Sequence, residues 1–315
     1  MGAVPLINAR KWAIRLGGLV VCALPLCWLL ATDRLKILLS LRVELVVTVS
    51  ALIVIGYFFS GVQYYRTLAK LGCRLSKLDI LFFPFMQSFW GLVIPFQGTT
   101  LFAATYLKVR YRFKVVDSAA MVIFLYMLNF LFGGGSGVVC SLLGRDLASP
   151  LFVFSVVSLG MPMYFLGLAC YLRKSSLPRF VPRRIEMLLR SFFSSLHILL
   201  VDWKELLALS TLQVLRQLCY CTLFVFVARG MGIDAGWTWG YLVAVGQELS
   251  VAIKFTPGNL GIAELMAGIV SGLTGVAVAD GIAISFTMTI IQMALCVIIG
   301  GMGNILFLRG IRVIR

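Results

Sequence analysis

Long apolar runs constrain this chain more than any other feature of its sequence. Candidate helices cover residues 13–31, 44–63, 78–95, 98–107, 117–143, 150–172, 205–228, 237–255, 260–278 and 282–308. Several of these runs are long enough to cross about 30 Å of hydrocarbon at about 1.5 Å per residue. The sequence therefore predicts an all-α, polytopic integral membrane protein that forms a single transmembrane domain over residues 1–315.

Composition excludes the main alternative, a large soluble protein with buried helices. The chain is 61% apolar and 13% charged, with a mean hydropathy of +1.00, whereas soluble domains are about half apolar and about a quarter charged. Its net charge of +16 comes mostly from basic residues between the apolar runs. The positive-inside rule and anionic lipid head groups account for that charge, so we expect no nucleic-acid partner.

Cysteine and histidine usage indicates no metal chemistry. Seven of the eight cysteines lie in apolar runs, where a free cysteine behaves as a small hydrophobe. The sequence has no zinc-binding spacing, and its one histidine, His197, has no obvious partner. We expect no metal, no cofactor and no catalytic residues.

The stretch "IPFQGTT" interrupts the third apolar run. Pro95 and Gly98, on either side of Gln97, predict a helix break, and only about ten residues follow it before the next basic loop. If 78–107 is a hairpin, the loops at 10–15, 66–77, 108–114, 173–204 and 309–315 share one side and carry 21 Lys and Arg residues, against five on the other. A single crossing would give 9 and 17. The charge bias favours the hairpin, with both termini cytoplasmic.

A second interrupted pair covers 237–278, with "KFTPGNLGIAEL" between its halves. Charge counting does not separate a hairpin from two short spans here, but a hairpin makes the pattern mirror the first. The chain then has about six full spans and two broken pairs, in inverted halves at 13–143 and 150–308 joined by a basic amphipathic linker at 173–204. Inverted repeats with broken helices are typical of transporters.

The segment 183–203 places apolar residues at helical spacing, with its charges largely elsewhere around the helix. Two interpretations are equally open: an amphipathic helix on the cytoplasmic membrane surface, and a connector packed on its own protein.

Four ionisable residues lie well inside apolar runs: Arg216, Glu248, Lys254 and Glu264. Each would cost about 2.5–3.5 kcal/mol near the bilayer centre, so we expect them to face one another or a wet cavity. Gln213 and Gln217 share a helix face with Arg216. One interpretation is a static ion-pair cluster that pins helices together, and the other is a polar route for a charged head group.

The second break also offers backbone donors. A phosphate that displaces a glutamate from Arg216 or Lys254 would gain N–H donors near Asn259 to Gly261, at the start of a helix. By contrast, "GGGSG" at 133–137 predicts close helix packing or a bend, because it lacks the strand and lysine of a phosphate-binding loop.

The residues of the second break carry a family resemblance. "KFTPGNLGIAE" resembles the Pro-Gly-x-Leu-Gly-x-x-Glu signature of the lysylphosphatidylglycerol synthase transmembrane region, the flippase-like part of the multiple peptide resistance proteins. The segments ending in "IPFQGTT" and beginning "LALSTLQVLRQL" are also similar to that family. Its signature corresponds here to Pro257, Gly258, Gly261 and Glu264, and its upstream break to Pro95 and Gly98.

The resemblance implies lipid translocation, or handling of a polyprenyl-linked sugar. Three positions depart from the family's pattern: Gln97 stands near an expected arginine, Thr99 and Thr100 stand where a glutamate is common, and an arginine of the last helix is replaced around Thr287 to Thr289. The chain ends at Arg315, so we expect a stand-alone member without the lysyl-lipid synthase domain.

Together these features predict a non-enzymatic protein of the bacterial or archaeal cytoplasmic membrane that moves an anionic lipid or lipid-linked glycan between leaflets. Head-group contact is expected from Arg216, Lys254 and Glu264, with Glu248 as a balancing charge or proton site. Two alternatives remain: a non-transporting scaffold for an envelope-biosynthesis enzyme, and an intramembrane polyprenyl-phosphate sugar transferase.

Overall fold

The computed structural model of the protein describes residues 42–94, 98–143, 182–250 and 256–314, with isolated positions between 152 and 167. All regular elements in these ranges are helices. The predicted first span at 13–31 and most of the predicted span at 150–172 lie outside the described residues. So do Pro95, Gln97 and Lys254.

Among the described residues, four long apolar elements have the length and composition to cross a membrane. They are α3 (Val43–Lys70), α6 (Val115–Leu143), α9 (Trp203–Gly230) and the continuous helix formed by α12 (Val278–Leu295), the π-helical turn Cys296–Gly300 and α13 (Gly301–Ile314). At about 1.5 Å per residue, 28 residues reach about 42 Å. These elements confirm the spans predicted at 44–63, 117–143, 205–228 and 282–308.

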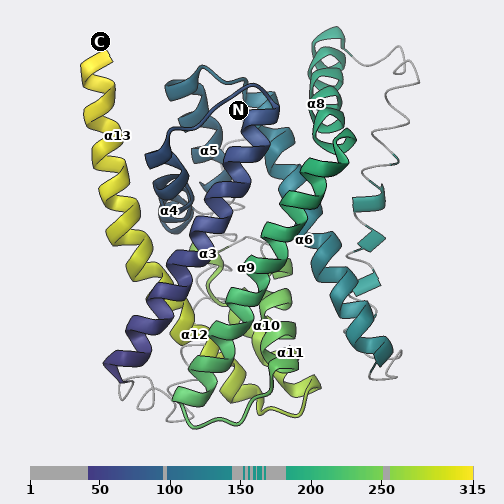
Figure 1. The fold of residues 1–315 in the computed structure, drawn as a ribbon, viewed down its shortest axis with the longest axis vertical. Coiled ribbons are helices and arrows are strands. Elements are labelled where there is room, and N and C mark those ends of the chain that lie inside the picture. The colour runs from purple at the N-terminus through teal and green to yellow at the C-terminus, as the bar shows by residue number, and fades with distance from the viewer. Residues whose placement is uncertain are drawn as a thin grey trace, which may run out of the picture.

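Four shorter helices form two hairpins. One hairpin pairs α4 (Lys77–Val93) with α5 (Gly98–Tyr111), and the other pairs α10 (Trp237–Ser250) with α11 (Ile262–Leu273). In Figure 1 the α4–α5 hairpin comes from the upper end of the molecule and the α10–α11 hairpin from the lower end, so that their tips approach near the middle. Both hairpins favoured by the sequence are therefore present.

The two hairpins sit in matching places along the chain. The order α3, α4–α5, α6 recurs as α9, α10–α11, α12, and Figure 1 shows α3 running upward while α9 runs downward. This is the order that an inverted repeat requires. The proposed halves themselves, 13–143 and 150–308, include segments outside the described residues.

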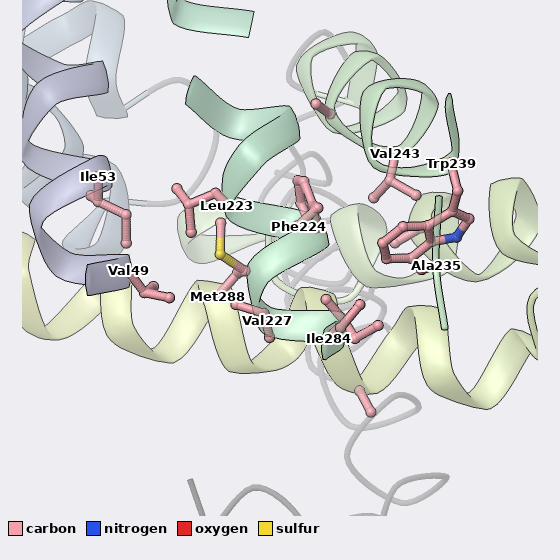
Figure 2. Packing of buried hydrophobic residues seen from close by; sticks show 14 of the residues in the cluster. Val49, Ile53, Leu223, Phe224, Val227, Ala235, Trp239, Val243, Ile284 and Met288 are labelled. Carbon is pink, nitrogen blue, oxygen red and sulfur yellow. The ribbon is translucent and has the colours of Figure 1, made fainter. Parts of the chain in front are cut away.

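An apolar cluster holds the long helices around the second hairpin. Figure 2 shows α9 side chains between those of α3 on one side and those of α10 on the other, with α12 and its Met288 and Ile284 running beneath them. Because lipid tails are as apolar as these side chains, close van der Waals packing rather than the hydrophobic effect stabilises the cluster. The labelled members are Val49, Ile53, Leu223, Phe224, Val227, Ala235, Trp239, Val243, Ile284 and Met288.

Charged residues gather at one end of the bundle, where α3 finishes and α9 begins. Arg66 Nε lies 2.6 Å from Glu205 Oε1, and Lys70 pairs with Asp202, which also caps α9. The α4–α5 hairpin opens at this same end (Figure 1), which brings the basic ranges 66–77, 108–114 and 183–204 together. Within the described residues, these three ranges therefore lie at one end of the bundle as the hairpin predicts, while 10–15 and 173–181 lie outside the described residues.

The amphipathic segment forms α8 (Arg183–Val201), which packs on α6. Leu196 and Leu199 are buried among α6 side chains, and Ser195 Oγ donates to Asp117 Oδ1 at 2.7 Å. Its C-terminal half thus follows the second interpretation, a connector packed on its own protein. Met187 and Leu188, nearer its start, stay exposed.

The "GGGSG" motif lies within the continuous helix α6. A Cβ at Gly134 would come within 2.8 Å of the Ser155 carbonyl oxygen, so no larger residue fits this contact. The prediction of close helix packing is confirmed.

Candidate functional site

The second break turns through three left-handed residues. Gly258 (φ 63°), Asn259 (φ 65°) and Gly261 (φ 85°) occupy a region that favours glycine and tolerates asparagine. Pro257 begins the short 3₁₀ turn Pro257–Asn259, which contains the first two of these residues. The two glycines and the asparagine thus suit the backbone path that reverses the chain between α10 and α11.

This turn contacts the first hairpin directly. A Cβ at Gly258 would lie 2.5 Å from Leu92 Cδ2 on α4 and 2.9 Å from Met293 Cε on α12, so a larger residue here would push both side-chain ends aside in addition to the backbone strain at φ 63°. Gly98, the first residue of α5, lines the same cavity as Gly258 and Asn259. The structure therefore brings the two predicted breaks together.

Between the breaks lies a cavity of about 140 Å³, which we call the break cavity. Asn259 is buried beside it: its Nδ2 donates to Ser250 Oγ at 2.6 Å, while its Oδ1 has no partner within the part of the chain that the structure describes. The cavity is lined by Ser88, Gly91, Leu92, Ile94, Gly98, Thr99, Gln247, Thr256, Gly258, Asn259, Ala263, Thr289, Gln292, Met293 and Cys296.

Glu264 does not line this cavity. Its side chain is fully buried, with Oε2 accepting the Gly261 N–H at 2.6 Å and Oε1 accepting the Thr289 hydroxyl at 2.7 Å. The first of these bonds is the carboxylate half of a capping box at the start of α11. The chain thus supplies its own anion to this helix N-terminus, where negative charge is favoured.

This cap corrects one expectation from the sequence. The N–H groups near Asn259 to Gly261 were expected to be open to a phosphate, but Asn259 N–H donates to Thr256 O and Gly261 N–H donates to Glu264. The carboxylate three residues into α11 competes for the same donor that a ligand would use. Thr289, in the stretch where the resemblance expects an arginine, is the residue that binds Glu264.

Arg216 and Glu248 form the charged centre of the site. Arg216 Nη2 on α9 lies 2.9 Å from Glu248 Oε1 on α10. Gln213 and Gln217, predicted to share the Arg216 face, both donate to Glu248 Oε2, at 2.8 and 3.3 Å. Arg216 also donates to Asn129 Oδ1 on α6 at 2.9 Å. Three helices are therefore joined through one ion pair.

Beside this pair lies a second cavity of about 220 Å³, which we call the ion-pair cavity. The side chains of Arg216 and Glu248 are 15% and 10% exposed, and Arg216 Nε is buried with no hydrogen-bond partner among the described residues. The cavity is lined by Tyr57, Ser60, Tyr64, Pro84, Gln87, Ser88, Thr99, Tyr126, Asn129, Arg216, Tyr220, Ala244, Gln247, Glu248 and Gln292.

The two cavities are neighbours. Ser88, Thr99, Gln247 and Gln292 line both of them. Gln247 Nε2 lies 2.5 Å from Ser285 Oγ, and Gln292 Nε2 donates to Tyr57 Oη at 2.7 Å. Together the cavities make a polar tract through helices that are otherwise apolar.

The structure thus places the sequence-predicted residues in three groups. Arg216 and Glu248 face each other across a cavity, as expected. Gly98, Gly258 and Asn259 line the break cavity, whereas Glu264 stands apart and, within the described residues, makes no ion pair. The expectation that the buried charges form one set does not hold for Glu264, because the α11 cap and Thr289 satisfy its carboxylate.

Sequence reasoning missed the uncharged part of the site. Gln87, Asn129, Gln247 and Gln292 come from four different helices and line the ion-pair cavity. Their signal was present, since side-chain amides inside long apolar runs are costly in lipid and usually find partners. In the ranges that the structure describes, no three His, Cys, Asp or Glu side chains gather in a way that would hold a metal ion.

Comparison with known proteins identifies the family to which this chain belongs. Residues 15–300 match the family described as "Lysylphosphatidylglycerol synthase TM region". No curated protein and no solved structure matches the chain significantly. The matched range contains both hairpins, the ion pair and the signature turn. This chain belongs to the lysylphosphatidylglycerol synthase TM region family.

Proposed function

We propose that this multi-pass membrane protein moves the head group of an anionic lipid, or of a lipid-linked glycan, from one leaflet to the other without altering it covalently. One observation carries the proposal. A buried arginine with an unpartnered N–H lines a polar cavity where two oppositely inserted hairpins meet.

Arg216 is the group suited to a phosphate. Guanidinium donates in a planar fork that matches phosphate oxygens, and its buried Nε–H has no partner among the described residues. A phosphate that approaches from the cavity would compete with Glu248 for Nη2, and a turn of the Arg216 side chain would bring Nε–H to it as well. Gln213 and Gln217 would keep Glu248 hydrogen-bonded when Arg216 turns to the ligand.

The lining lowers the cost of carrying a charge through hydrocarbon. An unpaired ionised group near the bilayer centre costs several kcal/mol, and amide, hydroxyl and guanidinium groups offset much of that cost by replacing water. The acyl or prenyl tails need no such path and can stay in the lipid beside the helices. Only the head group has to cross.

The hairpins supply a route for alternating exposure. Each enters from its own end of the bundle, and their tips form the walls of the break cavity. A rigid-body shift of one hairpin against the other would open the site to one side at a time, as in transporters with broken helices. The sequence has no nucleotide-binding motif, so movement would be downhill, ion-coupled or driven by a partner.

The placement of the basic residues supports one orientation of the protein in the membrane. The end of the bundle that carries the basic ranges 66–77, 108–114 and 183–204 would face the cytoplasm under the positive-inside rule. In a bacterial or archaeal cytoplasmic membrane, both termini would then be cytoplasmic.

Leaflet exchange in liposomes tests the proposal. We expect the purified protein to equilibrate a fluorescent anionic phospholipid between leaflets, measured as the fraction bleached by external dithionite. Arg216→Gln should slow exchange by at least about tenfold, since it removes a charge-assisted bond of about 1.5–3 kcal/mol. Arg190→Gln is the matched control, because Arg190 also makes an ion pair, with Glu186, but is 53% exposed.

The alternatives give different results in the same assay. A scaffold leaves labelled lipids in their starting leaflet, and a sugar transferase yields a new lipid product visible by mass spectrometry. Either outcome, or equal exchange by the Arg216 and Arg190 variants, contradicts the proposal.

A further inference from the structure

We propose that the break cavity selects lipids whose head group beyond the phosphate is uncharged and rich in hydroxyls, such as glycerol, inositol or a sugar. This inference rests on the proposed function, and it assigns different parts of one head group to the two cavities. The phosphate lies at Arg216 in the ion-pair cavity, and the rest of the head group lies in the break cavity next to it.

The four shared lining residues make this division possible. Because Ser88, Thr99, Gln247 and Gln292 line both cavities, a phosphate beside Arg216 has its substituent directed along this common wall. The break cavity, at about 140 Å³, has room for a handful of heavy atoms, such as a glycerol or one sugar ring.

The lining of the break cavity matches hydroxyls. Asn259, only 6% exposed, lines the cavity and has a buried Oδ1 with no hydrogen-bond partner among the described residues, so a ligand hydroxyl that reaches this oxygen can donate to it. Gln247 and Gln292 each use one amide N–H on a neighbouring hydroxyl, and a side-chain amide can make several hydrogen bonds. A hydroxyl both donates and accepts, so it can use amide N–H and amide oxygen alike.

Among the described residues, none that lines the break cavity is acidic, so the lining offers an ammonium group no charged partner. Glu264 is fully buried behind Thr289 and is not part of the lining. Desolvating an ammonium without a carboxylate is costly, so amine-bearing heads should be disfavoured.

The test compares lipids that differ only in the head group. Liposomes receive fluorescent-acyl phosphatidylglycerol, phosphatidylinositol, phosphatidylserine, phosphatidylethanolamine or phosphatidic acid in separate preparations. Phosphatidylserine and phosphatidylglycerol have the same net charge, which separates the effect of the amine from that of charge. We expect the glycerol and inositol lipids to cross about fivefold to tenfold faster than the other three, the effect of about one buried hydrogen bond.

A further set of liposomes tests whether the transported head group is attached to diacyl chains or to a polyprenyl chain. A short polyprenyl-phosphate hexose is scored by periodate oxidation of its diols in the outer leaflet. Exchange of this lipid, of the diacyl lipids or of both identifies the source, because the break cavity would bind the same hydroxyls in each.

Asn259→Asp provides the decisive variant. It keeps the size of the side chain and its tolerance of left-handed backbone, but places a carboxylate at the unpartnered oxygen. The ratio of phosphatidylglycerol to phosphatidylserine exchange should fall by at least about fivefold. Asn304→Asp is the matched control, since Asn304 lies outside both cavities and accepts from Trp90. It should leave the ratio unchanged.

The outcomes separate this inference from the proposed function. If no lipid crosses, the proposed function fails. If lipids cross but amine-bearing heads match or exceed glycerol and inositol, the selectivity assigned to the break cavity is wrong while translocation stands. An unchanged ratio in Asn259→Asp also overturns the assignment.

Discussion

Glu264 on α11 accepts a hydrogen bond from Thr289 on α12 at 2.7 Å, and this contact explains how a carboxylate can be fully buried in an apolar bundle. One oxygen caps the helix and the other is held by the hydroxyl. Glu264, the acidic residue of the family signature, thus has a structural role in this protein.

Thr289→Val should lower stability, because it keeps the shape of the side chain and removes the hydroxyl. One carboxylate oxygen then stays buried without its partner, at a cost of about 1–3 kcal/mol. Thermal unfolding in detergent measures the loss. Thr222→Val is the control: its hydroxyl bonds only to Leu218 O on an exposed face, so Tm should change little. Equal Tm values for the two variants would contradict the role given to Thr289.

Gly258→Ala should destabilise the second break more than Gly72→Ala destabilises its loop. Both glycines have positive φ, so each alanine costs about 1 kcal/mol of backbone strain. At Gly258 the added Cβ also meets Leu92 and Met293, whereas at Gly72 nothing lies within 4 Å. Gly258→Ala should therefore lower Tm further and slow leaflet exchange, and Gly72→Ala should leave exchange near its original rate.

The double variant Arg216→Gln/Glu248→Gln tests whether the ion pair acts in transport or only stabilises the fold. Removing one charge of a buried pair leaves the other uncompensated, at about 3–5 kcal/mol, while removing both is far less costly. We expect each single variant to be less stable than the double. Exchange should remain low in the double variant, because no cation is left for the phosphate. If exchange returns together with stability, the pair serves only to hold the helices together.

Acid should weaken the charged end of the bundle. The Lys70 ammonium, followed by the backbone N–H of Glu205, holds the pKa of the Asp202 carboxyl below its usual range. Because the folded pKa is depressed, the stabilisation is present above the unfolded value of about 4 and is lost as the pH falls through the folded value. Tm measured below pH 4 should fall more steeply in the original protein than in Asp202→Asn, which keeps a cap acceptor but does not titrate.

The hairpins predict opposite sidedness for two exposed turns. Arg112 follows α5 and Asp234 precedes α10, at opposite ends of the bundle in Figure 1. In a background without native cysteines, Arg112→Cys and Asp234→Cys should react with a membrane-impermeant maleimide from opposite sides. A cysteine at Thr99, within the site, should react far more slowly than either. A single crossing at 78–107 would move both turns together, so Arg74→Cys, before α4, tests the first hairpin itself: it should react from the same side as Arg112→Cys, and reaction from opposite sides would rule out that hairpin.

The fold was predicted best from the sequence in segments where one property, such as apolar length or charge, dominates. The described spans follow from apolar length, and the α4–α5 hairpin follows from charge counting across Pro95 and Gly98. The face shared by Gln213, Arg216 and Gln217 follows from helical spacing alone. The α10–α11 hairpin needed the analogy with the first, because both topologies return the chain to the same side.

The sequence did not predict which buried residues on different helices contact one another. Arg216 could have paired with Glu248 or Glu264, since spacing in sequence does not say which acid faces it. Helix packing placed Glu248 opposite and turned Glu264 back onto its own helix start. The amides at Gln87, Asn129 and Gln292 were visible as isolated polar residues, but only their convergence from separate helices makes them a lining.

The sequence by itself determined that this is a membrane protein, because long apolar runs are stable in lipid and not in water. It also determined where the backbone reverses, because proline and glycine act on the local backbone conformation. Tertiary structure alone decided which buried groups meet. Hydrogen bonds and ion pairs act over about 3 Å, and that distance between α6, α9 and α10 is fixed by how the helices pack rather than by the order of their residues.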